Sequence, residues 1–138
     1  VLSQRNVFVN AAKEMLKIGD TERAIELLDM CQECVPEENF PLDMTYLGFS
    51  NEYMVIDMIE TYYDAGAGEK ALDLAGRFID EIFVSTEFFL NWYDLAKDEF
   101  ESCYNCISYV AELTDHYGDT GFADEIRNRF NSLLDIEE

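Results

Sequence analysis

The stretch that decides the fold is Arg5–Glu38, which reads RNVFVNAAKEMLKIGDTERAIELLDMCQECVPEE. On both sides of Gly19, apolar and small residues recur every three or four positions, which is helical spacing. The spacing predicts one helix over 4–17 and a second over 21–34, with Gly19 in the turn between them. Glycine accepts the positive φ that ends many helices, because it has no Cβ. We therefore expect a helical hairpin.

The order of large, small and turn residues in this hairpin matches the tetratricopeptide pattern, a helix–turn–helix repeat of 34 residues. Small residues where the two helices cross let their backbones approach to about 8–10 Å. Asp20 or Thr21 can cap the second helix, and a proline cannot continue it. An ordinary amphipathic hairpin is the alternative interpretation. The matching positions are Phe8, Ala11, Ala12, Gly19, Ala24, Leu28, Cys31 and Pro36.

The same offsets recur twice along the chain. After Gly66 they are filled by Ala71, Ala75 and Phe78, and after the Gly118–Asp119 turn by Ala123 and, in place of Leu28 or Ala75, Arg127. A polar, atypical unit is typical of the end of a repeat array. The prediction is an all-α fold of tetratricopeptide-like antiparallel helix hairpins, stacked in a short right-handed superhelix of six or seven helices.

We expect the chain to form a single domain over 1–138, with repeat units at about 5–38, 52–85 and 104–135. The connector 39–51 contains many large apolar residues and is expected to pack against the domain. An inserted helix is expected within 86–103, with Ser85 or Thr86 as its cap.

The charge narrows the class of partner. Thirty acidic residues against nine basic ones give a formal net charge of −21, and a hydrophobic content of 49% excludes a disordered chain. Such a field repels nucleic acid and anionic lipid and favours a basic protein or peptide, or bound cations. A well-solvated surface of helix-forming Glu and Asp is the more ordinary interpretation of the same charge. No apolar run approaches the roughly 18–20 residues that span a bilayer, so no direct membrane insertion is expected. Because the chain begins at Val1, we expect it to be part of a longer protein.

The chain resembles the C-terminal soluble region of a bacterial membrane-protein family of unknown function. The proteins of that family carry many N-terminal membrane spans, related to protein O-mannosyltransferases, and then a tetratricopeptide-like tail. The resemblance implies a non-catalytic, periplasmic tail of a membrane glycosyltransferase-like protein, which could dock on its own membrane domain. It rests on Arg5–Phe8, the Gly19–Asp20 turn, Ala24–Asp29, Cys31 before Pro36, Tyr62–Gly66 and the Tyr117–Asp119 turn.

The four cysteines form two C-x-x-C pairs, Cys31 with Cys34 and Cys103 with Cys106. Two such pairs can build a four-thiolate zinc site, which makes a structural metal-binding domain the alternative function. Because both pairs fall within predicted helices, we favour buried structural thiols, with a disulfide or a metal site as the other interpretations. His116 is the only histidine, and the sequence shows neither a nucleophile triad nor a phosphate-binding loop. No enzyme activity and no cofactor are expected.

The remaining candidate site is the groove lined by the first helix of each repeat. In the first two units its consensus positions are Asn6, Val9, Lys13, Leu16, Tyr53, Ile56, Glu60 and Tyr63. A mixed apolar and acidic groove suits a helix or an extended segment that carries basic residues. The alternative is that Tyr53, Ile56 and Tyr63 are covered by the connector and belong to the core. We expect a non-catalytic protein–protein interaction or scaffold module.

Overall fold

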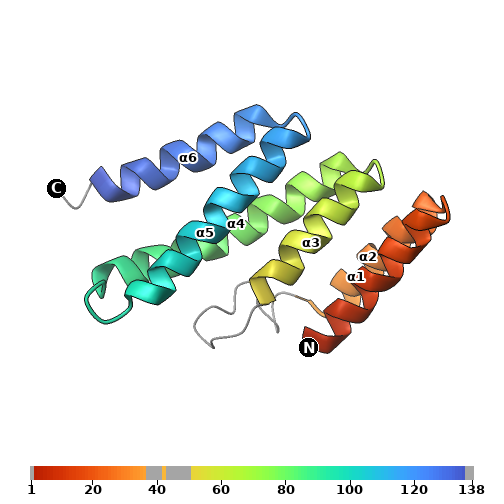
Figure 1. Ribbon diagram of the computed structural model, residues 1–138, viewed down its shortest axis with the longest axis horizontal. Coiled ribbons are helices and arrows are strands. Elements are labelled where there is room, and N and C mark those ends of the chain that lie inside the picture. Colours follow the sequence, from red (N-terminus) through yellow and green to blue (C-terminus); the bar gives the residue numbers. More distant parts are fainter. Residues whose placement is uncertain (1, 37–41, 43–50, 136–138) are drawn as a thin grey trace. The chain divides into compact units, whose positions relative to one another are not determined.

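The computed structural model describes residues 2–36, 42 and 51–135, and these ranges hold six α-helices and no strand (Figure 1). The prediction of an all-α fold is confirmed. The helices are α1 (Leu2–Lys17), α2 (Thr21–Cys34), α3 (Asn51–Asp64), α4 (Gly68–Asn91), α5 (Lys97–His116) and α6 (Thr120–Asp135).

The chain divides into two compact units, Val1–Phe78 and Ile79–Glu138, and the continuous helix α4 contributes to both. In the first unit α1 packs against α2, and α3 contacts both of them. In the second unit α5 packs against α6. Arg129 of α6 also reaches α4, where its guanidinium lies 4.2 Å from the centre of the Phe83 ring and pairs with Asp80 at 2.8 Å.

The three helix turns share one backbone motif. Gly19, Gly66 and Gly118 have φ values of 83°, 80° and 94°, as the predicted turns require. The N–H of each glycine donates to the carbonyl three residues earlier, and the next N–H donates to the carbonyl five residues before it. This pair of bonds is the Schellman motif, which satisfies the last carbonyls of a helix. A side chain at any of these glycines would be strained by the positive φ.

The offsets from each turn are also reproduced. Five residues after the glycine lie Ala24, Ala71 and Ala123, each fully buried, and each N–H donates to the carbonyl of the residue that follows the glycine. Nine residues after the glycine, Leu28 and Ala75 are buried whereas Arg127 is exposed. The internal register predicted from the sequence therefore holds in all three hairpin turns.

Within the first hairpin, the predicted cap is Asp20, whose side chain accepts a hydrogen bond from the N–H of Arg23 at 3.1 Å. The connector predicted over 39–51 lies outside the described residues except for Leu42, which is buried, and Asn51, which begins α3.

The inserted helix expected within 86–103 is not a separate element. Helix α4 continues without a break to Asn91, and residues 97–103 form the first turns of α5. Thr86 does not cap a helix; it is fully buried and its hydroxyl donates to the Ile82 carbonyl at 2.6 Å, one turn earlier in the same helix. The bond satisfies the buried hydroxyl inside the helix, and the buried stripe that leads to Phe89 keeps the segment helical.

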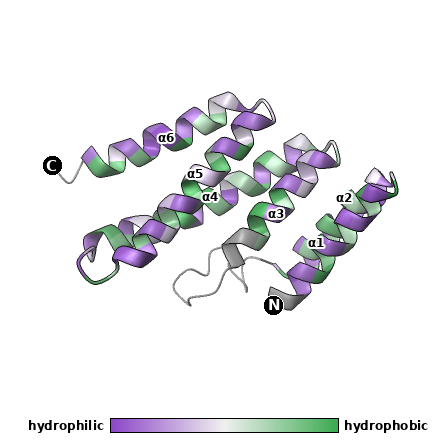
Figure 2. Cartoon of the chain, viewed as in Figure 1, coloured by the Kyte–Doolittle hydropathy of each residue, from purple (hydrophilic) through white to green (hydrophobic). Residues whose placement is uncertain are grey.

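Apolar and polar residues alternate along each helix at amphipathic spacing (Figure 2). Of the helices that the structure describes, none is long and apolar enough to cross a membrane.

Candidate functional site

The predicted groove positions differ in their accessibility. Val9 and Ile56 are buried, and so is Tyr63; Asn6 is exposed, whereas Lys13, Leu16 and Glu60 are half-buried. The side chain of Tyr53 lies outside the described residues. Direct contact with a partner on this surface can therefore come from Asn6, Lys13, Leu16 and Glu60.

Helices α1 and α3 bring part of this set together. Lys13 of α1 pairs with Asp57 of α3, with 3.2 Å between Nζ and Oδ2. Both side chains remain partly exposed, so the pair contributes little to stability, about 0–1 kcal/mol. The pair shows that α1 and α3 present these positions side by side, and that the positive charge of Lys13 has a carboxylate partner.

A polar cluster that the sequence analysis did not predict joins α2, α3 and α4. The Tyr62 hydroxyl donates to Asp29 at 2.7 Å and accepts from Gln32 at 2.6 Å. Arg77 donates to the Gln32 side-chain carbonyl at 2.6 Å, and Lys70 pairs with Asp29 at 2.5 Å. Burial, and then the bond to Asp29, raise the pKa of the Tyr62 phenol. The cluster fixes the position of α3 on α2, so we assign it a structural role.

All four cysteines lie within helices, as predicted, but the prediction of buried thiols holds for only three of them. Cys31, Cys103 and Cys106 are buried, whereas Cys34 is exposed. Burial raises the pKa of the Cys31 thiol to about 11, against the opposing effect of the Arg5 charge. A thiol held neutral in this way is a poor nucleophile and a poor metal ligand at neutral pH.

We expect thiol labelling of the native protein to modify Cys34 quickly and the three buried cysteines slowly. Reaction with a thiol-specific chromogenic disulfide should show one fast equivalent of the four, and all four after denaturation. Incubation with zinc before labelling is the matched control. Fast reaction of all four native thiols would contradict the burial, and protection of Cys34 by zinc would support the metal-binding alternative.

Within the described ranges, no three His, Cys, Asp or Glu side chains are grouped so that they could hold a metal ion. His116 is the last residue of α5, and its ring packs edge-to-face on Tyr117 with 5.0 Å between centroids. The four-cysteine zinc site thus finds no geometric support in these ranges.

An apolar stripe is exposed at the C-terminal end of α4 and in the turn that follows. Val84, Phe88 and Trp92 are four residues apart, and Leu95 follows at the next three-residue step. All four side chains are more than half exposed. Single exposed apolar residues are normal, but four large ones within twelve residues of the chain favour a contact surface.

Helices α5 and α6 enclose an open groove of about 520 Å³, which we call the α5/α6 groove. The buried residues Ile107, Ala111 and Phe130 form its floor. Its rim consists of exposed or half-buried side chains, namely Tyr104, Ser108, Glu112, Arg127, Asn131 and Leu134.

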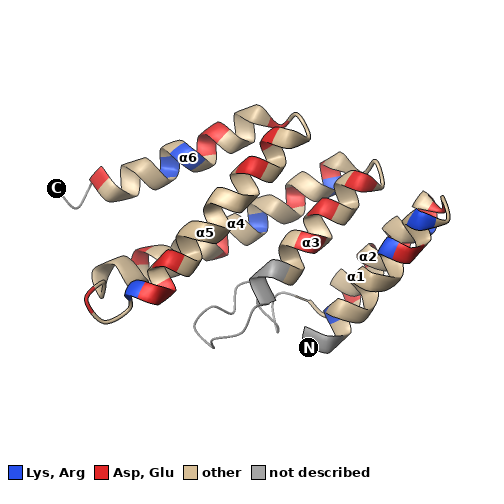
Figure 3. Cartoon of the chain, in the orientation of Figure 1, with Lys and Arg blue, Asp and Glu red and all other residues tan. Residues whose placement is uncertain are grey.

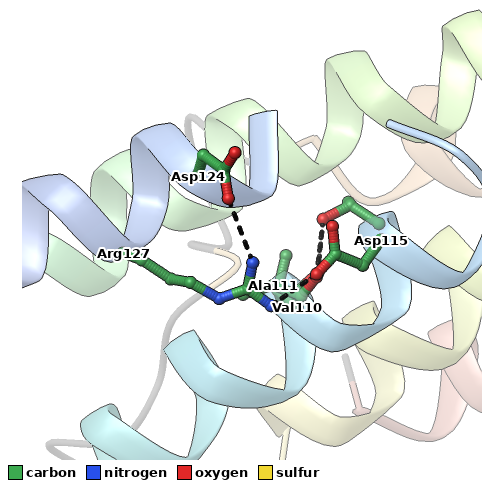
Figure 4. Close-up of polar contacts among 6 residues, drawn as sticks. Val110, Ala111, Asp115, Asp124 and Arg127 are labelled. Atoms are coloured by element: carbon green, nitrogen blue, oxygen red, sulfur yellow. Dashed lines mark hydrogen bonds and ion pairs between the residues drawn. The ribbon is translucent and has the colours of Figure 1, made fainter. Parts of the chain in front are cut away.

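Arg127 ties the two walls of this groove together (Figure 4). From α6 it donates to Asp115 of α5 at 2.6 Å and to Asp124 of its own helix at 3.3 Å. The hydrogen bond to Asp115 raises the pKa of Arg127. Asp115 and Asp124 outweigh the single positive charge of Arg127, so together with Glu112 the charged groups at this groove carry a net negative charge. Acidic residues occur on all six helices (Figure 3).

Comparisons of the chain with protein-family models, with curated proteins and with solved structures return no match.

Proposed function

We propose that the chain is a non-catalytic protein–protein interaction or scaffold module made of tetratricopeptide-like hairpins. The recurrence of one turn motif and one buried alanine in three hairpins supports this repeat class. Stacked helical repeats build extended surfaces, and such surfaces bind other proteins.

The observation that carries the proposal is the exposed stripe of Val84, Phe88, Trp92 and Leu95. Aromatic residues such as Phe88 and Trp92 are enriched in the buried cores of protein interfaces. A partner that covers the stripe would remove this apolar area from water, which is worth roughly 25 cal/mol per Å².

The non-catalytic part of the proposal is supported by the titratable groups. The pKa shifts of Cys31, Tyr62 and Arg127 each have a structural cause, either burial or a carboxylate partner. Catalytic groups usually combine a shifted pKa with a cleft. Arg127 does line the α5/α6 groove, but its charge is occupied by Asp115 and Asp124.

We also propose that the module is the periplasmic tail of a membrane-anchored, glycosyltransferase-like protein, and that its partner is either a basic protein or its own membrane domain. This part rests on the family resemblance of the sequence motifs around Gly19, Tyr62 and Gly118. The acidic surface supports the choice of a basic partner, since it would steer the encounter.

Site-specific photo-crosslinking in cells of the native organism tests both parts. A photoreactive residue in place of Phe88 should crosslink to a protein, whereas the same residue in place of the neighbouring, exposed Glu87 should not. A third probe at Asn6 tests the α1 surface. The absence of crosslinks from both Phe88 and Asn6 would overturn the interaction module.

The same blot, without irradiation, tests the parent protein. A band far heavier than 16.0 kDa in the membrane fraction is expected if the chain is the tail of a membrane protein. A band near that mass outside the membrane fraction would contradict the membrane-anchored parent, and would leave the interaction module itself standing.

A further inference from the structure

We propose that the α5/α6 groove binds an amphipathic helix of a partner protein, and that this helix places a basic side chain opposite Glu112. The proposal rests on the interaction module proposed above and adds the site and the chemistry of the partner. It follows from a comparison of two hairpins within the chain, one covered and one open.

The residues that line the α5/α6 groove have counterparts at the same distances from the turn glycine in the α1/α2 hairpin. Counted from Gly118 and Gly19, the floor residues Ile107, Ala111 and Phe130 correspond to Phe8, Ala12 and Cys31. The rim residues Tyr104, Ser108, Glu112, Arg127, Asn131 and Leu134 correspond to Arg5, Val9, Lys13, Leu28, Gln32 and Val35.

In the α1/α2 hairpin this surface is covered by α3. Asp57 of α3 pairs with Lys13 at 3.2 Å, and Tyr62 of α3 bonds to Gln32 at 2.6 Å. The space left among α1, α2, α3 and α4 is only about 20 Å³, and Met58 of α3 lines it. The equivalent surface on α5 and α6 has about 520 Å³ of open space. The α5/α6 groove therefore has the shape of a helix-binding groove, and neither α5 nor α6 fills it.

Burial confirms the difference between the two surfaces. Arg5 and Val35 are 1% and 3% exposed, whereas their counterparts Tyr104 and Leu134 are 46% and 39% exposed. In α3 and α4 the described residues at these offsets are also buried, except for the half-buried Glu60, which takes the place of Lys13 and Glu112. The buried ones are Val55, Ile56, Ile59, Ala75, Phe78, Ile79 and Ile82.

The charges select the occupant. Where the first hairpin has Lys13 facing the acidic Asp57, the α5/α6 groove has Glu112, so the facing position requires a basic side chain. Asn131 takes the place of Gln32 and calls for a hydroxyl or another hydrogen-bonding group opposite it. A second copy of this chain does not fit, because its α3 would bring Asp57 against Glu112 and two chains of charge −21 repel each other.

The probe is a labelled peptide with the sequence of α3, in which lysines replace Glu52, Asp57, Glu60 and Asp64. Its acidic twin keeps the α3 sequence. Fluorescence anisotropy with the full chain, at about 0.15 M salt to screen distant charges, should show the lysine peptide binding about 10-fold tighter or more.

Two variants locate the binding site. Ser108→Trp puts an indole into the groove and should weaken binding of the lysine peptide by about 10-fold or more, which corresponds to about 1.4 kcal/mol. Glu112→Lys should weaken it by about 5- to 10-fold through like-charge repulsion. The matched control is Glu125→Lys, the same charge change at an exposed position of α6 outside the groove lining, which should change the affinity by less than about 2-fold.

Equal affinity for wild type, Ser108→Trp and Glu112→Lys would overturn the groove as a binding site, as would equal effects of Glu112→Lys and Glu125→Lys. Circular dichroism of each variant shows whether it is folded, and Glu112→Lys alters only an exposed side chain. The absence of crosslinks from both Phe88 and Asn6 would overturn the interaction module instead. Failure of the groove proposal and failure of the interaction module therefore give different results.

Discussion

Replacement of Leu28 by Arg should unfold the first unit, whereas the reciprocal change Arg127→Leu should alter the free energy of unfolding by less than about 1 kcal/mol. The two residues occupy the same position, nine residues after a turn glycine. Leu28 is fully buried, and Arg127 lies on the groove rim with its side chain 43% exposed. An uncompensated charge in place of Leu28 would cost several kcal/mol, a large part of the roughly 5–15 kcal/mol that stabilises a domain.

Urea unfolding followed by circular dichroism measures both variants, and Leu28→Ala provides a value if the arginine variant does not fold. The alanine variant should lose about 2–5 kcal/mol, because it leaves a cavity at a fully buried site. Met30→Ala in the same helix, at an exposed position, should stay within about 0.5 kcal/mol of wild type. A Leu28→Arg protein as stable as Arg127→Leu would contradict the burial of Leu28 and the exposure of Arg127.

The second large effect is expected in α4. Phe78→Ala should reduce the free energy of unfolding by about 3–5 kcal/mol, since Phe78 is fully buried twelve residues after Gly66. Phe88 lies ten residues further along the same helix and is 58% exposed. Because so much of its side chain is already in water, Phe88→Ala should cost less than about 1 kcal/mol, mainly through loss of the edge-to-face contact with Phe89 at 5.5 Å.

Chemical denaturation of the two phenylalanine variants under the same conditions gives this comparison. Because both replacements remove the same side chain from the same helix, differences in helix propensity cancel. Similar losses at the two positions would show that the Phe88 stripe is part of the core, and would remove the observation on which the interaction module mainly rests.

The helices and their turns were predictable from local information. Helical spacing over 4–17 and 21–34 and a glycine at each turn are properties of neighbouring residues, and the turn motif at Gly19 involves only residues 15–20. Arg127 was recognised in the same way as the polar exception at a position where Leu28 and Ala75 are apolar. Its exposure agrees with that interpretation.

The end of α4 shows where local information misled. Ser85 and Thr86 are residues typical of a helix start, and they predicted a break at this point. In the structure Thr86 bonds to the carbonyl of Ile82 inside an unbroken helix. A threonine serves either purpose, and burial on one side of α4 decides between them.

The candidate sites were predicted only in part. Helical spacing placed Val9, Ile56 and Tyr63 on one surface, but it could not tell an open groove from a packed one, and these three side chains are buried. The α5/α6 groove was missed, although the offsets that defined the first two units, applied to Gly118, indicate Ser108 and Glu112. The spacing of the groove positions from the turn glycine, which was applied to the first two hairpins, was not applied to the third.

The sequence by itself determined the all-helical fold, the positions of the three glycine turns, the shared register of the hairpins and the acidic surface. Each of these follows from residue spacing or from composition, and none of them depends on contacts between distant parts of the chain. Only the tertiary structure decided which faces are covered. It showed that α3 pairs with Lys13 and bonds to Gln32, while the equivalent surface around Glu112 and Asn131 stays open. The physical reason is that periodicity marks a face of one helix, whereas burial depends on which other helix packs against that face.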